Sequence, residues 1–176
     1  MTAPTPAGDI GAVRPPRRAP EALHVAVHAD GVRLPLGRRS VAELARGVLR
    51  AERVRAAELS FTFVTAAAMA ALNRRHLGHR GPTDIITFEL APVPGAPVTG
   101  DVYVCPDVAR ENARAHGAGV REELARLVVH GTLHVLGREH PEDEGRTRSP
   151  MWRRQEALLA RLFPARPRAA VQSGRA

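Results

Sequence analysis

A chain of 176 residues with a formal net charge of +8 is long enough for one domain with a proper core and suits a polyanionic partner. Its single cysteine, Cys105, excludes a disulfide framework, and no apolar run approaches the roughly 18 residues that span a bilayer. The N-terminus also lacks the apolar core of a secretory signal. We therefore predict a cytoplasmic protein, because a lone cysteine fits a reducing compartment.

The two ends of the chain differ in composition from the rest. Residues 1–20 and 164–176 are rich in proline, alanine and arginine, and we predict that both are disordered tails. The tails contribute +5 to the formal net charge of +8, so the body of the chain is only weakly basic. One folded domain is expected over residues 21–163.

Apolar spacing predicts two strands and two helices in the first half of this domain. In chain order they are a strand over 23–29, a helix over 40–53, a strand over 58–64 and a helix over 65–73. Ser40 and Glu43 have the spacing of a capping box, which would open the first helix. Thr65 is expected to cap the second helix with its hydroxyl group.

The second half is expected to contain two strands and three helices. The elements are strands over 84–90 and 101–105, an irregular proline-rich loop over 91–99 between them, and helices over 106–116, 119–136 and 149–163. The two strands are expected to form a hairpin. In the second of the three helices a core stripe is predicted, and in the last a set of core-covering residues. The stripe is Leu124, Leu127, Val128, Gly131 and Val135, and the covering set is Trp152, Leu158, Leu159 and Leu162. The whole predicts an α+β domain with a small mixed four-stranded sheet packed by about five helices.

One stretch carries the pattern of a metal site, His130-Gly131-Thr132-Leu133-His134-Val135-Leu136-Gly137-Arg138-Glu139-His140. His130 and His134 lie four residues apart, so both imidazoles share one face of a helix. Gly137 is predicted to end the helix in a left-handed conformation, which lets the chain turn and bring His140 back to the pair. Three neutral imidazoles with a fourth position left for water are the ligand set of a catalytic zinc, although nickel, copper or iron also suit them.

The residue after the first histidine separates two chemistries. Metzincin proteases read H-E-x-x-H-x-x-G-x-x-H, and the glutamate is their general base. Gly131 occupies that place here and can neither accept nor donate a side-chain proton. The sequence therefore predicts a metzincin-like metal helix without the base of a peptidase.

Three segments resemble the YbeY family of bacterial ribosomal-RNA maturation factors. The metal stretch is similar to that family's H-G-x-L-H-L-x-G-[YH]-D-H element. Leu72-Asn73 followed by residues 82–88 (PTDIITF) is similar to its L-N and P-T-[DN]-V-L-S-F segments, and residues 100–105 (GDVYVC) resemble its L-G-D-I-x-I strand. The resemblance covers roughly residues 22–163, in the family's order.

The resemblance implies a single-strand-specific, metal-dependent endoribonuclease that matures the ends of small-subunit ribosomal RNA and supports ribosome quality control. Ribosomal RNA and ribosomal particles would be its partners, and His130, His134 and His140 would hold one zinc ion per chain. The chain departs from the family at Leu77, where many members have an arginine thought to matter for activity. Arg138 and Glu139 replace the usual aromatic residue and aspartate.

Further side chains are candidates for catalytic or substrate-binding roles beside the metal. Asp84 or Asp101, or alternatively Glu139 or Glu142, would act as a base or orient a histidine. Three clustered arginines are candidates for binding phosphate, namely Arg74, Arg75 and Arg80. With six aromatic residues in the chain, an extensive base-stacking platform is not expected.

Two other functions stay open at this point. A zinc metallopeptidase would share the ligand spacing but lack its base at Gly131. A non-catalytic ribosome-assembly factor, stabilised by its metal, would fit the loss of the family arginine at Leu77. If the metal is structural its removal should unfold the domain, whereas a catalytic metal can leave without loss of the fold.

Overall fold

The computed structural model describes residues 21–90, 94–141 and 145–164, so the predicted tails lie outside the described residues except for Pro164. The elements in chain order are β1 (Ala22–Ala29), α1 (Arg38–Ala51), β2 (Ala56–Phe63), α2 (Ala66–Leu77), β3 (Ile85–Glu89), β4 (Val98–Val104), α3 (Pro106–Ala115), α4 (Val120–Val135), a 3-10 turn η1 (Arg146–Arg148) and α5 (Pro150–Leu162). None of the described helices has the length and apolar character needed to cross a membrane.

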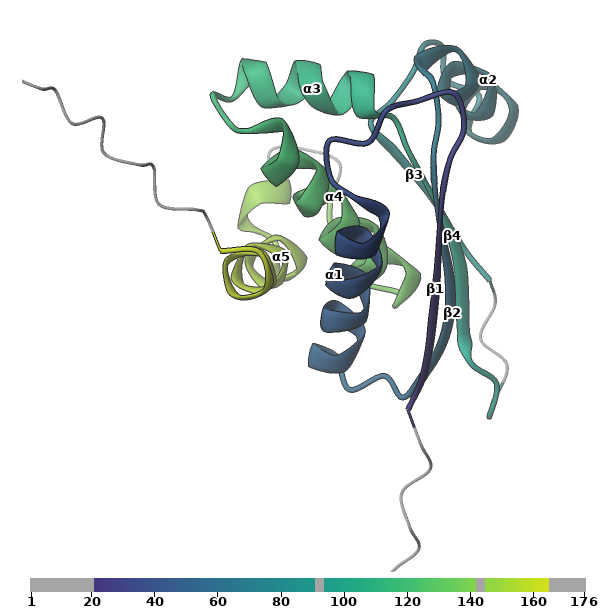
Figure 1. Cartoon of the computed structure of the whole chain (residues 1–176), viewed down its shortest axis with the longest axis vertical. Coiled ribbons are helices and arrows are strands. Elements are labelled where there is room, and N and C mark those ends of the chain that lie inside the picture. The colour runs from purple at the N-terminus through teal and green to yellow at the C-terminus, as the bar shows by residue number, and fades with distance from the viewer. Residues whose placement is uncertain (1–20, 91–93, 142–144, 165–176) are drawn as a thin grey trace, which may run out of the picture.

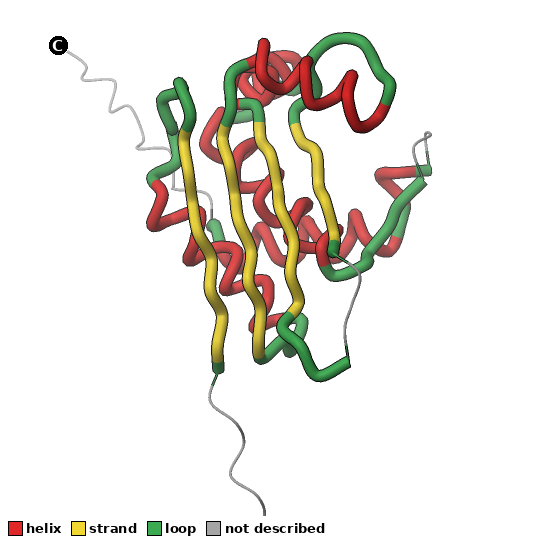
Figure 2. Tube along the Cα trace, turned by 90° about the vertical axis from the view of Figure 1, so that its right-hand side faces the viewer, coloured by secondary structure: helices red, strands yellow, loops and turns green. Residues whose placement is uncertain are grey.

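The four strands form one mixed sheet in the order β1-β2-β4-β3 (Figure 2). β1, β2 and β4 run parallel, and β3 pairs antiparallel with β4. The predicted hairpin of the third and fourth strands is therefore confirmed, as is the α+β class with a four-stranded sheet and five helices. β4 begins earlier than predicted, at Val98, because its pairing with β2 starts at the Ala57–Val98 register position inside the stretch expected to be irregular.

The two faces of the sheet are covered differently. Figure 1 shows α1, α4 and α5 stacked on one face, where alternate residues of β2 and β4 are buried. These core strand residues are Ala57, Leu59, Phe61, Phe63, Val102 and Val104. The shorter α2 lies at one end of the opposite face, where Met69 packs with Val64, Ile86 and Cys105 in a second, smaller cluster. Cys105 is a buried free cysteine in this cluster.

Helix α4 and the sheet approach each other closely at two points. A Cβ atom added to Gly131 of α4 would lie 2.7 Å from a methyl group of Val102, and one added to Gly100 of β4 would lie 2.7 Å from a methyl group of Val135. At the first point a glycine of α4 therefore faces a valine of β4. At the second point, four residues further along α4, a valine of α4 faces a glycine of β4. This double fit fixes the height and rotation of α4 over β4.

Two local predictions about the helices are wrong. α1 begins at Arg38 with Gly37 as its N-cap, and no side chain caps it. Ser40 and Glu43 therefore lie inside the helix, where Glu43 accepts a 2.7 Å hydrogen bond from Arg39 instead of forming a capping box. In α5, Trp152 is only half-buried and does not join the core, while the unpredicted Met151 does.

Other local predictions are confirmed. The Thr65 hydroxyl caps α2 by accepting a hydrogen bond from the Ala68 N–H, and α2 runs on to Leu77, where Gly78 ends it at a φ of 71°. In α5, Leu158 and Leu159 are buried in the core, and Leu162 packs against it.

Candidate metal centre

The three predicted histidines meet at the C-terminal end of α4. His130 and His134 lie on neighbouring turns of the helix, which ends at Val135. Gly137 follows with a φ of 70°, as predicted, and the chain turns back so that His140 faces the pair. One ring nitrogen from each histidine lies within 4.8 Å of the other two, and the Nε2 atoms of His134 and His140 are 3.3 Å apart. The residues are placed to hold one metal ion.

Two histidines of this cluster, His130 and His134, are held in the neutral form that a metal requires. Burial, together with the charges of His134, Arg146 and His140, lowers the pKa of His130 to about 3, although the hydrogen bond that His130 donates to Gln155 opposes the shift. Burial and the charges of His140 and Arg146 lower the pKa of His134 to about 4. Both imidazoles are therefore neutral at pH 7, and each has a lone pair available for a cation.

Hydrogen bonds at the other ring nitrogens decide which atoms face the metal position. The Nδ1–H of His130 donates to the side-chain oxygen of Gln155 at 2.7 Å, and Gln155 is only 1% exposed. The Nδ1–H of His140 donates to the carbonyl oxygen of Pro141 at 2.8 Å. These bonds place the proton on Nδ1 and leave Nε2 of both histidines as the metal-binding atom. Sequence reasoning missed Gln155, since it lies 25 residues from His130 in another helix.

The cluster forms one wall of a hollow of about 660 Å³. The segment before β3 forms part of its rim, and that segment is held by the side chain of Asn73, which is 5% exposed and donates to the carbonyl oxygen of Gly81 at 2.9 Å. Leu77 and His79 also line the hollow. The position at which many family members have an arginine is therefore next to the metal centre, as the resemblance implied.

The structure brings one of the two predicted aspartates to this hollow. Asp84 lines it and accepts a hydrogen bond of 3.1 Å from Asn112, which fixes its carboxylate. Asp101 does not lie there, so the prediction of a role for it beside the metal is not supported. Its neighbours Gly100 and Val102 face α4, so Asp101 points to the opposite face of the sheet, where it accepts a 2.7 Å hydrogen bond from Ser60.

The arginines of the site are not those that the sequence suggested. Arg74 and Arg75 in the last turn of α2, and Arg80 after it, are exposed and do not line the hollow, although they flank Leu77 and His79. Arg146 at the start of η1 does line it, and its charge acts on His130 and His134. Its Nε atom is buried without a hydrogen-bond partner in the described part of the chain. No motif marks Arg146 in a sequence with 26 basic residues, and only folding shows its position.

Gly131 has a structural reason to be glycine. It points away from the histidines into the sheet, where an added Cβ would lie 2.7 Å from Val102 and 3.0 Å from Ile85. A side chain at this position would force α4 away from the sheet, so the absence of a peptidase base follows from the packing of α4.

A model of the family described as Endoribonuclease YbeY matches residues 34–163 of this chain. The chain belongs to the YbeY family. Relatives named endoribonuclease YbeY include one from Frankia casuarinae, 43% identical over 133 residues, which cover 68% of this chain and 65% of the relative. One from Beutenbergia cavernae is 45% identical over 119 residues, covering 62% and 77% respectively. One from Mycobacterium tuberculosis is 39% identical over 113 residues, covering 58% and 63%.

The matched region spans less than two thirds of the Frankia and Mycobacterium relatives. Among solved structures, the chain is similar to the solution structure of a protein from Thermotoga maritima. The TM-score is 0.56 at 24% identity, and the likeness covers 79% of this chain and 89% of that one. The fold of this member of the YbeY family therefore resembles one that has been determined in solution.

Proposed function

We propose that this protein is a zinc-dependent endoribonuclease that cuts single-stranded RNA in the cytoplasm and matures the ends of small-subunit ribosomal RNA. The observation that carries the proposal is the meeting of three imidazoles with Asp84 and Arg146 around one open hollow. The names of the relatives support the reaction class. Ribosomal particles as partners, and a part in ribosome quality control, extend the same proposal.

The donor set fits zinc. His130, His134 and His140 would supply three nitrogen ligands and leave room for a further ligand, as in catalytic rather than structural zinc sites. When bound, zinc supplies a Lewis acid and lowers the pKa of a coordinated water. The hydrogen bond from His130 to Gln155 holds the first imidazole in its ligand tautomer before any metal arrives.

The remaining residues of the hollow have complementary tasks. The guanidinium of Arg146 is the cation placed beside the histidines, where it would bind phosphoryl oxygens and stabilise charge that develops on them. The carboxylate of Asp84, fixed by Asn112, would accept the proton of the attacking water. Arg74, Arg75 and Arg80 remain proposed contacts for the RNA backbone further from the cleaved bond.

Two alternatives make different demands on the same residues. A peptidase of the metzincin kind needs a base after the first ligand. This chain has Gly131 there, packed so closely against Val102 that a side chain would displace α4. A non-catalytic, metal-stabilised ribosome-assembly factor is favoured by one observation, the 50% exposed Leu77 at the rim of the hollow where the family arginine would stand. Arg146 offers a cation at the same hollow, which favours the nuclease.

The deciding experiment is the cleavage of a labelled single-stranded RNA by purified protein, with zinc quantified in the same sample. His134→Ala should lose both cleavage and about one bound zinc per chain. His28→Ala, the same substitution at an exposed position of β1, should keep both. Full zinc loading without cleavage would overturn the nuclease and leave the assembly factor. Cleavage that persists in His134→Ala would show that another site, or a contaminant, cuts the RNA.

A further inference from the structure

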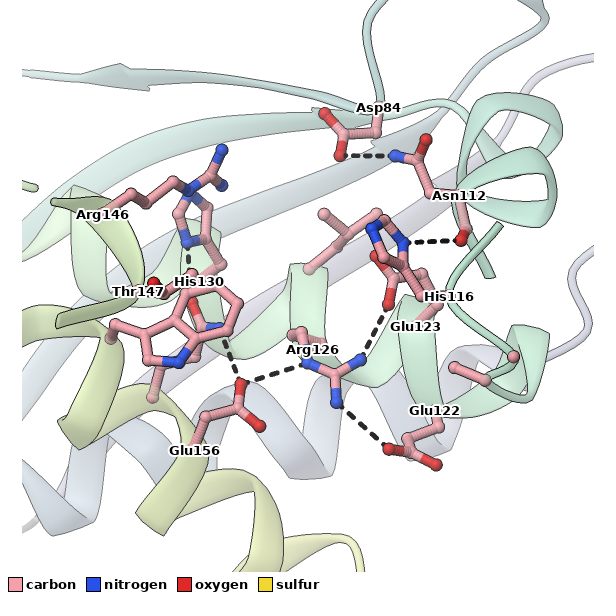
Figure 3. Close-up of a pocket in the computed structure, with 15 residues that line it drawn as sticks. Asp84, Asn112, His116, Glu122, Glu123, Arg126, His130, Arg146, Thr147 and Glu156 are labelled. Atoms are coloured by element: carbon pink, nitrogen blue, oxygen red, sulfur yellow. Dashed lines mark hydrogen bonds and ion pairs between the residues drawn. The ribbon is translucent and has the colours of Figure 1, made fainter. Parts of the chain in front are cut away.

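A second hollow of about 650 Å³ adjoins the metal centre (Figure 3). Asp84, His130 and Arg146 line both hollows, so a chain bound at the histidines can continue into the second one. The volume is within the range of pockets that hold small organic ligands and is large enough for one nucleoside. No residue role assigned so far uses this space.

One wall of this hollow is rigid. Arg126 donates from three different nitrogens to three carboxylates, those of Glu156, Glu123 and Glu122, at distances of 2.7 to 3.1 Å. Figure 3 shows this fan of contacts on the side opposite Asp84. Arg126 is 19% exposed, and its guanidinium is fully engaged, so it shapes the wall and is not free to bind a phosphate.

The chemistry of the lining favours a ligand that donates hydrogen bonds. Four carboxylates line the hollow against two guanidinium groups, and a phosphate inside it would be repelled. Asp84 accepts hydrogen bonds from Thr83 and Asn112. Glu156 accepts from Arg126 and Gln155, both at the same oxygen. Each carboxylate oxygen has more than one acceptor site, so both groups retain capacity to accept from a ligand. The hollow is therefore rich in acceptors.

An aromatic surface completes the lining. Trp152 is the sole tryptophan of the chain, is half-buried and lines this hollow rather than the core. Single-stranded nucleic acids bind by stacking their bases on such side chains, and base edges that carry amino groups donate to carboxylates. Adenine and cytosine carry such a group at the edge where uracil has a carbonyl oxygen.

We propose that this second hollow binds one base of the RNA, the nucleotide next to the phosphate held by the metal centre and Arg146. The base stacks on Trp152, and its exocyclic amino group donates to the carboxylates, so adenine or cytosine is preferred over uracil. This inference rests on the proposed function, since it names where the same strand continues. It also assigns a specificity to a protein whose six aromatic residues offer no long stacking platform.

The sole tryptophan makes a direct test possible. Adenosine 5′-monophosphate should quench the fluorescence of Trp152 in a saturable way in the zinc-loaded protein. Uridine 5′-monophosphate should bind about tenfold more weakly, and ribose 5-phosphate, which has no base, should not quench. Equal effects of all three ligands, or none from any, would overturn the proposal.

Cleavage gives an independent measurement on the same residue. In a strand of uridines with one adenosine, wild-type protein should cut beside the adenosine. Trp152→Ala should lose that preference, and Trp152→Phe, which keeps a stacking ring, should retain it. Cleavage without preference in wild type would overturn the base site while the nuclease stands. Quenching by adenosine 5′-monophosphate without any cleavage would support the base site and remove the proposed function.

Discussion

Replacing Gly131 by alanine tests the argument that close packing of α4 positions the metal ligands. The new Cβ would lie 2.7 Å from Val102, a stiff, fully buried side chain in β4, and 3.0 Å from Ile85. The end of the Ile85 side chain can move, but the β-branched Val102 cannot swing away, so α4 itself must shift from the sheet. Overpacking of this kind costs about 1–3 kcal/mol, while alanine in a helix gains about 1 kcal/mol over glycine.

Gly47→Ala is the matched control, because Gly47 also lies inside a helix and gains the same propensity. Its new Cβ would lie 3.1 Å from the end of the Leu162 side chain, which is half-buried and flexible. The free energy of unfolding, measured by urea titration, should therefore be about 1–3 kcal/mol lower for Gly131→Ala than for Gly47→Ala.

The metal provides a second measurement of the same shift. Displacement of α4 moves His130 and His134 relative to His140, so zinc affinity should fall in Gly131→Ala and remain unchanged in Gly47→Ala. If the two variants proved equally stable, the contact between Gly131 and Val102 would not be the constraint that we describe. Loss of stability with normal zinc binding would separate the packing from the metal site.

Three further outcomes follow from the structure. Glu52, 6% exposed, accepts 2.7 Å hydrogen bonds from Arg138 and Arg154, and although burial alone would raise its pKa, these two partners lower it below 4.5. Glu52→Gln should therefore cost about 1–2 kcal/mol of unfolding free energy at pH 7. A depressed folded pKa contributes stability above the unfolded pKa and loses it as pH falls through the folded value. The two proteins should therefore converge as the pH falls below the usual glutamate range, and a constant gap in urea titrations would contradict this. Gln155→Ala should weaken zinc binding about 10–100-fold in a competition titration with a chelating dye, while Gln155→Glu keeps an acceptor for His130 and binds as wild type. Removal of zinc by a chelator should leave the far-ultraviolet circular dichroism spectrum unchanged, since the main core contains none of the three ligands; unfolding would favour a structural metal.

The sequence was sufficient for the metal centre itself. The positions of His130, His134 and Gly137 determine a local geometry, because helix periodicity and a left-handed glycine act over a few residues. The hairpin of β3 and β4 and the Thr65 cap were predictable for the same reason. The sequence was misleading at Ser40 and Glu43. Their spacing matches a capping box, but α1 begins at Arg38, two residues before the predicted cap, so both residues lie inside the helix.

The surroundings of the metal centre depended on the tertiary structure. Successive side chains of a strand point to opposite faces of the sheet, but the sequence pattern does not say which face a distant helix will cover. Because α4 covers the other face, Asp101 lies on the far side of the sheet, whereas Asp84, just before β3, lines the site. Gln155 reaches His130 from 25 residues away, and Arg146 reaches the site through a turn without a motif. The sequence by itself therefore determined which residues are placed to hold a metal, because they are neighbours along the chain. Only the tertiary structure decided which residues surround it, because those contacts join elements that no local pattern connects.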